Sequence, residues 1–167
     1  MKYKLISAVC RGGGIGKDGH LPWNIKEDLA FFSKLTKGNG NNAVVMGRKT
    51  WESIGSKPLS GRDNLVMSKS MKGKKNDASW FSCIEEIDAH CETKKYDQVW
   101  VIGGAQIYKD FLDAGKIDAA CITYIDQAFN CDTQFPQLSK GWQLTATVPL
   151  ETTQPYAVEI RRLIMLE

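Results

Sequence analysis

The sequence predicts an α/β fold around a largely parallel central sheet. Apolar runs of strand length alternate with segments of helical periodicity over most of the chain, as is typical of βαβ units. Near the end, three strand-like runs follow one another without helices, which indicates antiparallel pairing at one edge of the sheet. A chain of 167 residues is long enough for a substantial core, so we expect a single domain over residues 1–167.

The expected elements follow from the spacing of apolar residues along the chain. Buried strands appear as short apolar runs, and helices as apolar residues three or four positions apart. The expected strands before the end of the chain are residues 4–10, 42–47, 64–68, 78–83 and 98–104. The expected helices are residues 25–35, 48–54, 84–92 and 105–114. The strands without helices between them are residues 118–125, 142–150 and 156–166. Polar, Gly- and Lys-rich segments predict surface loops at residues 37–42 and 69–77.

The composition is that of an ordinary soluble protein. Hydrophobic residues make up 43% of the chain and charged residues 25%, and the net charge of +3 is too small to indicate a nucleic-acid or membrane partner. The apolar run near the N-terminus is too short for a signal sequence and fits a buried first strand. No stretch approaches the length of a membrane span.

Cysteine and histidine usage argues against a disulfide framework or a metal centre. The five cysteines are widely spaced, no CxxC occurs, and the only histidines are His20 and His90. We therefore expect a reducing compartment, a cytoplasmic location and no metal site.

An aspartate lies in the middle of the apolar face of the first helix. At about 100° per residue, Ile25, Phe32 and Leu35 share one face with Asp28, whereas Glu27 points elsewhere. One interpretation is that Asp28 meets the free N–H groups and the positive dipole of the helix start. A buried carboxylate needs a partner, however, and no cation shares its face. The partner therefore lies elsewhere in the fold or is a ligand.

Three strand ends suit an anionic ligand. Gly103 and Gly104 join a strand to a helix, so a phosphate can approach the backbone and the helix N-terminus, although a tight turn explains them too. At the start of another helix, Arg48 and Lys49 oppose the dipole unless an anion binds there. Ser68 and Lys69 follow a third strand and suit another phosphate or a plain surface position. Because these ends meet at the carboxyl edge of an open sheet, we expect a nucleotide-binding α/β enzyme.

The chain resembles dihydrofolate reductase. The segments IGKDGHLPWNIKEDLAFF, VVMGRKTWESI, PLSGRDNLVMS, VWVIGGAQIY and DTQFP occur in the family's order and spacing, and the match covers nearly the whole chain. The resemblance implies a mostly parallel eight-stranded sheet with flanking helices and an antiparallel C-terminal edge. It also implies NADPH-dependent reduction of 7,8-dihydrofolate to tetrahydrofolate, and binding of antifolates such as methotrexate or trimethoprim.

The resemblance also assigns the substrate side. Asp28 matches the carboxylate that accepts hydrogen bonds from the pterin, and Thr123 the threonine bound to that acid. Arg62 matches the arginine that holds the glutamate tail. The catalytic set that the resemblance implies is Asp28, Thr123, Leu21, Trp23 and Tyr108. The substrate-binding set is Phe32, Ser53, Ile54, Leu59 and Arg62.

The resemblance places the cofactor along four segments and implies a cis peptide between Gly103 and Gly104. Hydride is expected to pass from nicotinamide C4 to pterin C6, while water delivers a proton to N5 and Asp28 orients the substrate. The implied cofactor set is Ala8, Ile15, Gly47, Arg48, Lys49, Thr50, Ser68, Lys69, Ile102, Gly103, Gly104, Ala105, Gln106 and Ile107.

Two features depart from the family's pattern. Cys131 stands before DT where a small residue is common, and three glycines are consecutive at residues 12–14, in the loop expected to close over the nicotinamide. Because glycine loses the most backbone freedom on ordering, we expect this loop to be mobile when empty. Replacing Gly13 with Ala should tighten NADPH binding if its φ is negative and weaken it if φ is positive.

Two other functions are compatible with parts of the pattern. A related reductase of the same fold, such as that of riboflavin synthesis, is not expected to combine LPW, Asp28 and TWESI. A non-catalytic nucleotide-binding module would need no acid in an apolar pocket, so Asp28 with Thr123 argues against it. Without an appended thymidylate synthase domain or an evident assembly motif, we expect a stand-alone, monomeric reductase.

Overall fold

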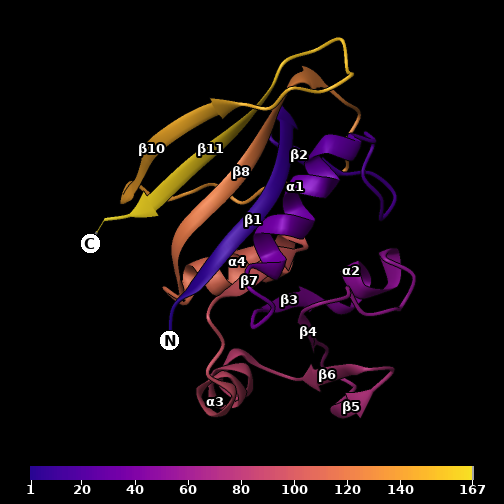
Figure 1. Ribbon diagram of the computed structural model, residues 1–167, viewed down its shortest axis with the longest axis vertical. Helices are drawn as coiled ribbons and strands as arrows, with labels where there is room; N and C mark the ends of the chain where they lie inside the picture. The colour runs from indigo at the N-terminus through magenta and orange to yellow at the C-terminus, as the bar shows by residue number, and fades with distance from the viewer. Residues whose placement is uncertain (167) are drawn as a thin grey trace.

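The structure, a computed structural model, describes residues 1–166, and within them four helices cover a nine-stranded sheet (Figure 1). The helices are α1 (Lys26–Lys37), α2 (Arg48–Ser53), α3 (Ile84–Lys94) and α4 (Ala105–Asp113). The sheet strands are β1 (Tyr3–Arg11), β3 (Ala43–Gly47), β4 (Asp63–Met67), β5 (Gly73–Lys75), β6 (Ala78–Phe81), β7 (Val99–Gly103), β8 (Ile117–Ala128), β10 (Trp142–Pro149) and β11 (Val158–Met165). A separate two-stranded sheet pairs β2 (Gly14–Gly16) with β9 (Thr133–Gln134).

The order across the large sheet is β10-β11-β8-β1-β7-β3-β4-β6-β5. The six strands from β8 to β6 run parallel to one another, whereas β11 and β10 at one edge and β5 at the other pair antiparallel. The predicted fold class is confirmed, and so is the antiparallel C-terminal edge.

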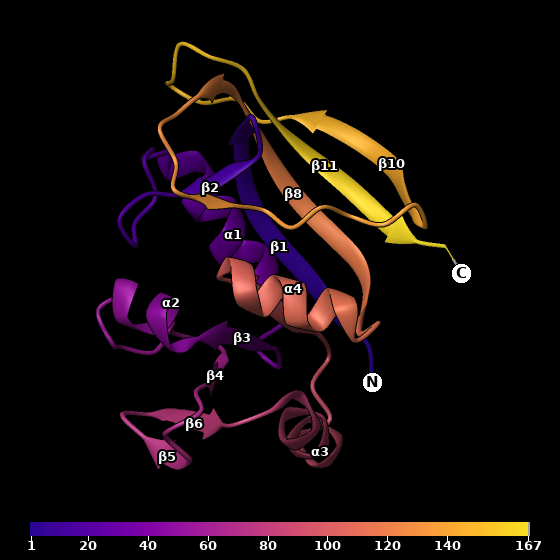
Figure 2. The ribbon, with the colours of Figure 1, turned by 180° about the vertical axis from the view of Figure 1, so that it is seen from behind.

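Successive residues of the central strands face opposite sides of the sheet, and each side has its own core. Leu5 of β1 packs in the core beneath α3 and α4, together with Phe111. Its neighbour Ile6 packs in the opposite core, with Trp51 of α2 and the apolar face of α1. The two views show this layering, because α1 lies in front of β1 in Figure 1 and α4 lies in front of it in Figure 2.

Three details of the fold differ from the expectations. The segment 69–77, expected to be a loop, contains β5, which pairs with β6 and gives the sheet nine strands in place of eight. The segment 37–42, expected to lie on the surface, ends in Asn42, which is 3% exposed because its side chain bonds Thr36 and Gln98. The short β2 and β9 strands were not predicted. Within residues 1–166, no helix combines the length and the apolar character needed to cross a bilayer.

Candidate active site

The candidate site lies at the carboxyl ends of the parallel strands, where the first turn of α1 approaches β8. Asp28 is in that first turn, and Thr123 is in the centre of β8, paired with Ala8 of β1 on one side and Ile160 of β11 on the other. The Thr123 hydroxyl donates to Asp28 Oδ1 at 2.6 Å. Of the two expected partners of Asp28, a group elsewhere in the fold is therefore present, and a ligand stays a prediction.

Burial dominates the electrostatics of Asp28. Loss of water around the carboxyl raises its pKa, and the hydrogen bond from Thr123 opposes that rise only in part. Within residues 1–166 the hydroxyl of Thr123 is the one hydrogen-bond donor that reaches this carboxyl. The other oxygen, Oδ2, is therefore available to a ligand that brings N–H donors.

Asp28 lines a pocket of about 130 Å³ with Leu21, Trp23, Ile25 and Leu29. Trp23 is 7% exposed, and its indole N–H has no hydrogen-bond partner among residues 1–166. Leu21 and Leu29 are about half exposed, at 52% each. A carboxylate and an unpaired buried N–H beside open apolar side chains suit a ligand with both polar edges and a flat apolar body.

Glu27 points away from the face of α1 that carries Asp28, as expected. Its side chain is partly buried, with Oε2 accepting from the backbone N–H of Thr153 at 3.3 Å. Its Oε1 is buried and has no partner among the described residues. The two acids of the first turn thus face different surroundings, and only Asp28 lines the pocket.

Apolar side chains of α1, α2 and the loop after α2 form one surface near the pocket. Phe32 of α1, Ile54 at the end of α2 and Leu59 in the following loop are partly buried and pack on the same core. These three predicted substrate-binding residues therefore lie on one side of the sheet. Ser53 is exposed and its hydroxyl donates to the carbonyl of Thr50, so it contributes to the end of α2.

Arg62, just before β4, is held by hydrogen bonds that the sequence did not reveal. Its Nη1 donates to Thr36 Oγ1 at 2.9 Å and its Nε to the carbonyl of Ser60 at 2.9 Å. Partial burial lowers the pKa of the guanidinium. Asn64, 3% exposed, bonds the backbone of Leu59 and Arg62 and so shapes the loop that carries the arginine. A buried asparagine inside a predicted strand is the signal that could have identified it.

Tyr108 is buried between α4 and the sheet, and its phenol oxygen lies 2.7 Å from the carbonyl oxygen of Ile6 and 3.0 Å from that of Ile102. Burial raises the pKa of this phenol. The peptide between Gly103 and Gly104 is cis, as expected. A Cβ on Gly103 would lie 3.2 Å from the Tyr108 hydroxyl oxygen, so the glycine permits the close approach of the tyrosine. These residues join the end of β7 to the start of α4.

Two helix N-termini meet at this edge of the sheet. The N-cap residues of α2 and α4 are Gly47 and Gly104, and neither helix has a side-chain cap. A Cβ on Gly47 would lie 2.9 Å from Ile107, and one on Gly104 would lie 3.6 Å from the Thr50 hydroxyl oxygen. The unmet N–H groups and the absent side chains leave room for an anion against the backbone.

The predicted cations lie at the start of α2 and after the end of β4, and all are exposed. Arg48 lies 3.7 Å from Glu52 in an exposed ion pair, and Lys49 and Lys69 are exposed. Ser68 is partly buried and bonds Ser70. The remaining predicted cofactor residues lie in β1, β2 and β7 and in the first turn of α4: Ala8, Ile15, Ile102, Ala105 and Gln106. The exposed cations, together with the uncapped N–H groups of α2 and α4, fit a phosphate-bearing cofactor.

The glycine loop makes several hydrogen bonds in this structure, and its expected mobility when empty stays a prediction. Phe135 donates its N–H to the carbonyl of Gly13 at 2.9 Å, and Asp18 donates its N–H to Asp132 Oδ2 at 3.0 Å. With its amide nitrogen facing the loop, Gln134 also donates to the carbonyls of Gly12 and Gly13. The φ of Gly13 is +90°, so the condition for tighter NADPH binding in a Gly13→Ala variant is not met.

Comparisons with known proteins agree with this geometry. The family model described as dihydrofolate reductase matches residues 2–164. Dihydrofolate reductase of Aedes albopictus is 30% identical over 155 residues, covering 86% of this chain and 83% of that protein. The Arabidopsis thaliana bifunctional dihydrofolate reductase-thymidylate synthase 2 is 41% identical over 147 residues, covering 80% of this chain but only 26% of that longer protein. The structure of dihydrofolate reductase from Enterococcus faecalis, complexed with NADP(H) and RAB-propyl, superposes with a TM-score of 0.86 at 32% identity, covering 99% and 97% of the two chains.

Proposed function

The chain belongs to the dihydrofolate reductase family, and from this premise we propose how its residues divide the reduction of 7,8-dihydrofolate by NADPH among themselves. The observation that carries the assignment is the partly buried carboxyl of Asp28, bonded to Thr123 at 2.6 Å and facing an apolar pocket. The Thr123 hydroxyl takes one acceptor site of Oδ1, so both carboxylate oxygens keep acceptor sites for the substrate.

Asp28 anchors the pterin through its 2-amino and N3–H groups. A carboxylate accepts both donors at once, and such charge-assisted pairs are stronger than neutral hydrogen bonds. Thr123 is a positioning residue, because its hydroxyl fixes the Asp28 rotamer. Phe32 and Ile54 pack on the rings of the substrate, with Leu59 further out. Arg62, held by Thr36 and Ser60, presents its remaining N–H groups to the α-carboxylate of the glutamate tail.

The start of α4 and the ends of the neighbouring strands would hold the cofactor. When bound, NADPH would supply a hydride from nicotinamide C4 to pterin C6. Arg48, Lys49 and Thr50 would hold the pyrophosphate side at the uncapped start of α2, and Ser68 with Lys69 would hold the 2′-phosphate. The nicotinamide would lie near Ala8, Ile15, Ile102 and the Gly103–Gly104 pair, and the buried Tyr108 would support these residues through its bonds to the carbonyls of Ile6 and Ile102.

The proton that N5 gains comes from water. Asp28 binds the pterin at the edge away from N5, so it orients and polarises the substrate without delivering the proton directly. The unpaired indole N–H of Trp23 lies beside the same pocket and suits a water molecule there. Leu21 and Trp23 otherwise exclude bulk water from the reacting edge.

The proposed oligomeric state and cellular location rest mainly on the sequence. We infer a single-domain, monomeric enzyme in a reducing, cytoplasmic compartment. The support is the nine-stranded sheet, which takes strands from both ends of the described chain, and the wide spacing of the five cysteines in the sequence.

The test is an assay of the purified chain with NADPH and dihydrofolate, following the loss of the near-ultraviolet absorbance of NADPH. Methotrexate should block the reaction. A chain that binds NADPH but does not consume it with dihydrofolate would be a nucleotide-binding module. A chain that reduces a riboflavin precursor instead would be the related reductase of the same fold.

A further inference from the structure

Two cysteines that the reduction of dihydrofolate does not use lie in contact beside the glycine loop. The sulfurs of Cys10 and Cys131 are 3.8 Å apart, although the residues are separated by 121 positions in the chain. Cys10 is 1% exposed in β1, and Cys131 is partly exposed in the segment between β8 and β9. A disulfide needs the sulfurs only roughly 2 Å closer.

Gly14 makes this contact possible. A Cβ at residue 14 would lie 2.4 Å from Cys131 Sγ and 3.2 Å from Cys10 Sγ, so any other residue would push the Cys131 sulfur away. Gly14 is buried, and its backbone pairs with Gln134 of β9. The missing side chain therefore leaves the two sulfurs facing each other across the start of the loop.

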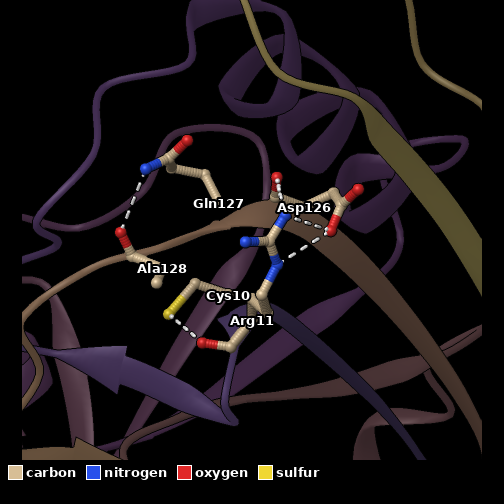
Figure 3. A network of polar contacts seen from close by, with 5 residues as sticks. All are labelled: Cys10, Arg11, Asp126, Gln127 and Ala128. Carbon is tan, nitrogen blue, oxygen red and sulfur yellow. Dashed lines mark hydrogen bonds and ion pairs between the residues drawn. The ribbon is translucent and has the colours of Figure 1, made fainter.

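The Cys10 side of the pair is fixed by the sheet. Figure 3 shows the end of β1 joined to the end of β8 by the Arg11 guanidinium, whose Nη2 lies 3.0 Å from Asp126 Oδ1. The Cys10 sulfur lies 3.5 Å from the carbonyl oxygen of Arg11 in the same view. The Cys131 segment leads into β9, outside the large sheet, so it is the side of the pair that shifts more readily.

That segment supports the glycine loop. The N–H of Asp132 donates to the carbonyl of Gly16 at 2.9 Å, and the Asp132 carboxylate accepts from the N–H of Asp18. The N–H of Phe135 donates to the carbonyl of Gly13. A bond that ties Cys131 to the end of β1 would therefore hold the whole loop over residues 12–18 against the sheet.

We propose that Cys10 and Cys131 are an oxidation site, in which a small-molecule disulfide such as oxidised glutathione converts the two thiols to an internal disulfide that restrains the glycine loop. The effect on turnover rests on the proposed function, in which this loop covers the nicotinamide. Formation of the bond does not depend on that function.

The chemistry is thiol–disulfide exchange in two steps. The thiolate of Cys131, the more accessible residue, attacks one sulfur of oxidised glutathione and releases one glutathione. The thiolate of Cys10 then attacks the Cys131 sulfur of the mixed disulfide and releases the second. Two protein thiols lose two electrons and two protons, and the glutathione disulfide is reduced to two thiols. Burial raises the pKa of Cys131, so little thiolate is present at neutral pH and the reaction is best run in mildly alkaline buffer.

The first test maps the bond in the full chain. Wild-type protein treated with oxidised glutathione should lose two of its five thiols, without retaining glutathione, and should yield a Cys10–Cys131 cross-linked peptide on digestion. The Cys131→Ser variant should give no such peptide, whereas Cys83→Ser should give it as wild type does. Wild type without the peptide, or with a different pair joined, would overturn the proposal.

A second variant tests the geometry without removing a thiol. Gly14→Ala keeps both cysteines but displaces Cys131, so its yield of the cross-linked peptide should fall severalfold. An unchanged yield would show that the contact across Gly14 does not govern the reaction.

The third measurement is functional. In the oxidised wild type, release of NADPH should slow severalfold, dithiothreitol should restore the original rate, and Cys131→Ser should not respond. A cross-linked enzyme that releases NADPH as fast as the reduced form would overturn the restraint on the loop. The reduced enzyme's assay with dihydrofolate tests the proposed function separately.

Discussion

The polar side chains expected to bind the substrate are held by hydrogen bonds inside the protein, whereas the cations expected to bind the cofactor extend into solvent. Asp28 is bonded to Thr123, and Arg62 to Thr36 and Ser60. Arg48 has only a 3.7 Å contact with Glu52, and Lys69 is exposed. Groups that are bonded and partly buried fix where the substrate lies, because moving them breaks contacts. Exposed cations attract the cofactor through a charge that solvent and salt weaken.

The largest effect is expected for Asp28→Asn. An amide offers one acceptor where the pterin presents two donors, and it cannot supply the negative charge, so kcat/KM for dihydrofolate should fall about 100- to 1000-fold at neutral pH. The variant should fold, because the Thr123 hydroxyl can still donate to the amide oxygen.

The matched control is Glu27→Gln, which makes the same change at the neighbouring acid that does not line the pocket. It should leave kcat/KM within a small factor of wild type. If Asp28→Asn kept wild-type kcat/KM, the anchoring role of Asp28 would be wrong.

Arg62→Lys tests the second prearranged group. Lysine cannot bond Thr36, Ser60 and a carboxylate with one planar group, so KM for dihydrofolate should rise about tenfold with a smaller change in kcat. A dihydropterin without the benzoylglutamate tail is the control substrate, and its kinetics should not change. A loss shared by both substrates would mean that Arg62 only supports the fold.

Lys69→Glu tests the exposed part of the site, where the 2′-phosphate of the cofactor is expected to bind. Reversing this charge should weaken NADPH by up to about tenfold and NADH much less, because only NADPH carries the 2′-phosphate. The effect should shrink as salt is added. Lys72→Glu, the same change three residues further along the same loop, where Lys72 pairs with Glu86 at 3.5 Å, should alter neither affinity. Equal losses for both cofactors would remove Lys69 from the phosphate site.

Gly13→Ala is expected to weaken NADPH binding severalfold, by about 1 kcal/mol. The φ of Gly13 is +90°, and an added Cβ would lie 3.1 Å from the end of the Gln134 side chain. Gly16→Ala is the control, because a Cβ there has only ordinary contacts, the nearest at 3.5 Å. Titration of NADPH into both variants checks this, and tighter binding in Gly13→Ala would restore the entropic interpretation of the loop.

The smallest expected effect is a pH-dependent difference in stability. The folded-state pKa of Asp28 is raised, so ionisation of this acid opposes folding. The stability that protonated Asp28 contributes is complete below the pKa of this acid in the unfolded chain. It is lost as pH rises through its pKa in the folded chain. In urea unfolding without ligands, Asp28→Asn should therefore be more stable than wild type at neutral pH, and this advantage should disappear in acid. A variant that is less stable at neutral pH would contradict the burial of the charge.

The sequence predicted most elements because their signals are local. Apolar periodicity located α1, and the lack of any cation near Asp28 on that helix face indicated a partner elsewhere. The contact of Arg62 with Thr36 could not be predicted in the same way, because Thr36 lies on α1, 26 residues away in the chain, and meets Arg62 only in the folded protein. The sign of φ at Gly13 could not be predicted from the sequence, for a different reason. Glycine accepts both signs of φ, so its presence does not tell which one the loop adopts.

The position of Thr123 has a consequence for how the site opens. Thr123 is in the middle of β8, the longest strand, with β1 on one side and β11 on the other, so its backbone is released only when the centre of the sheet separates. Lys69 follows the end of β4, and the glycine loop is held by a few bonds to a two-residue strand. Brief local unfolding should therefore release the cofactor side many times for each event that frees the partner of Asp28. A substrate anchored by Asp28 would keep its place while the cofactor side fluctuates.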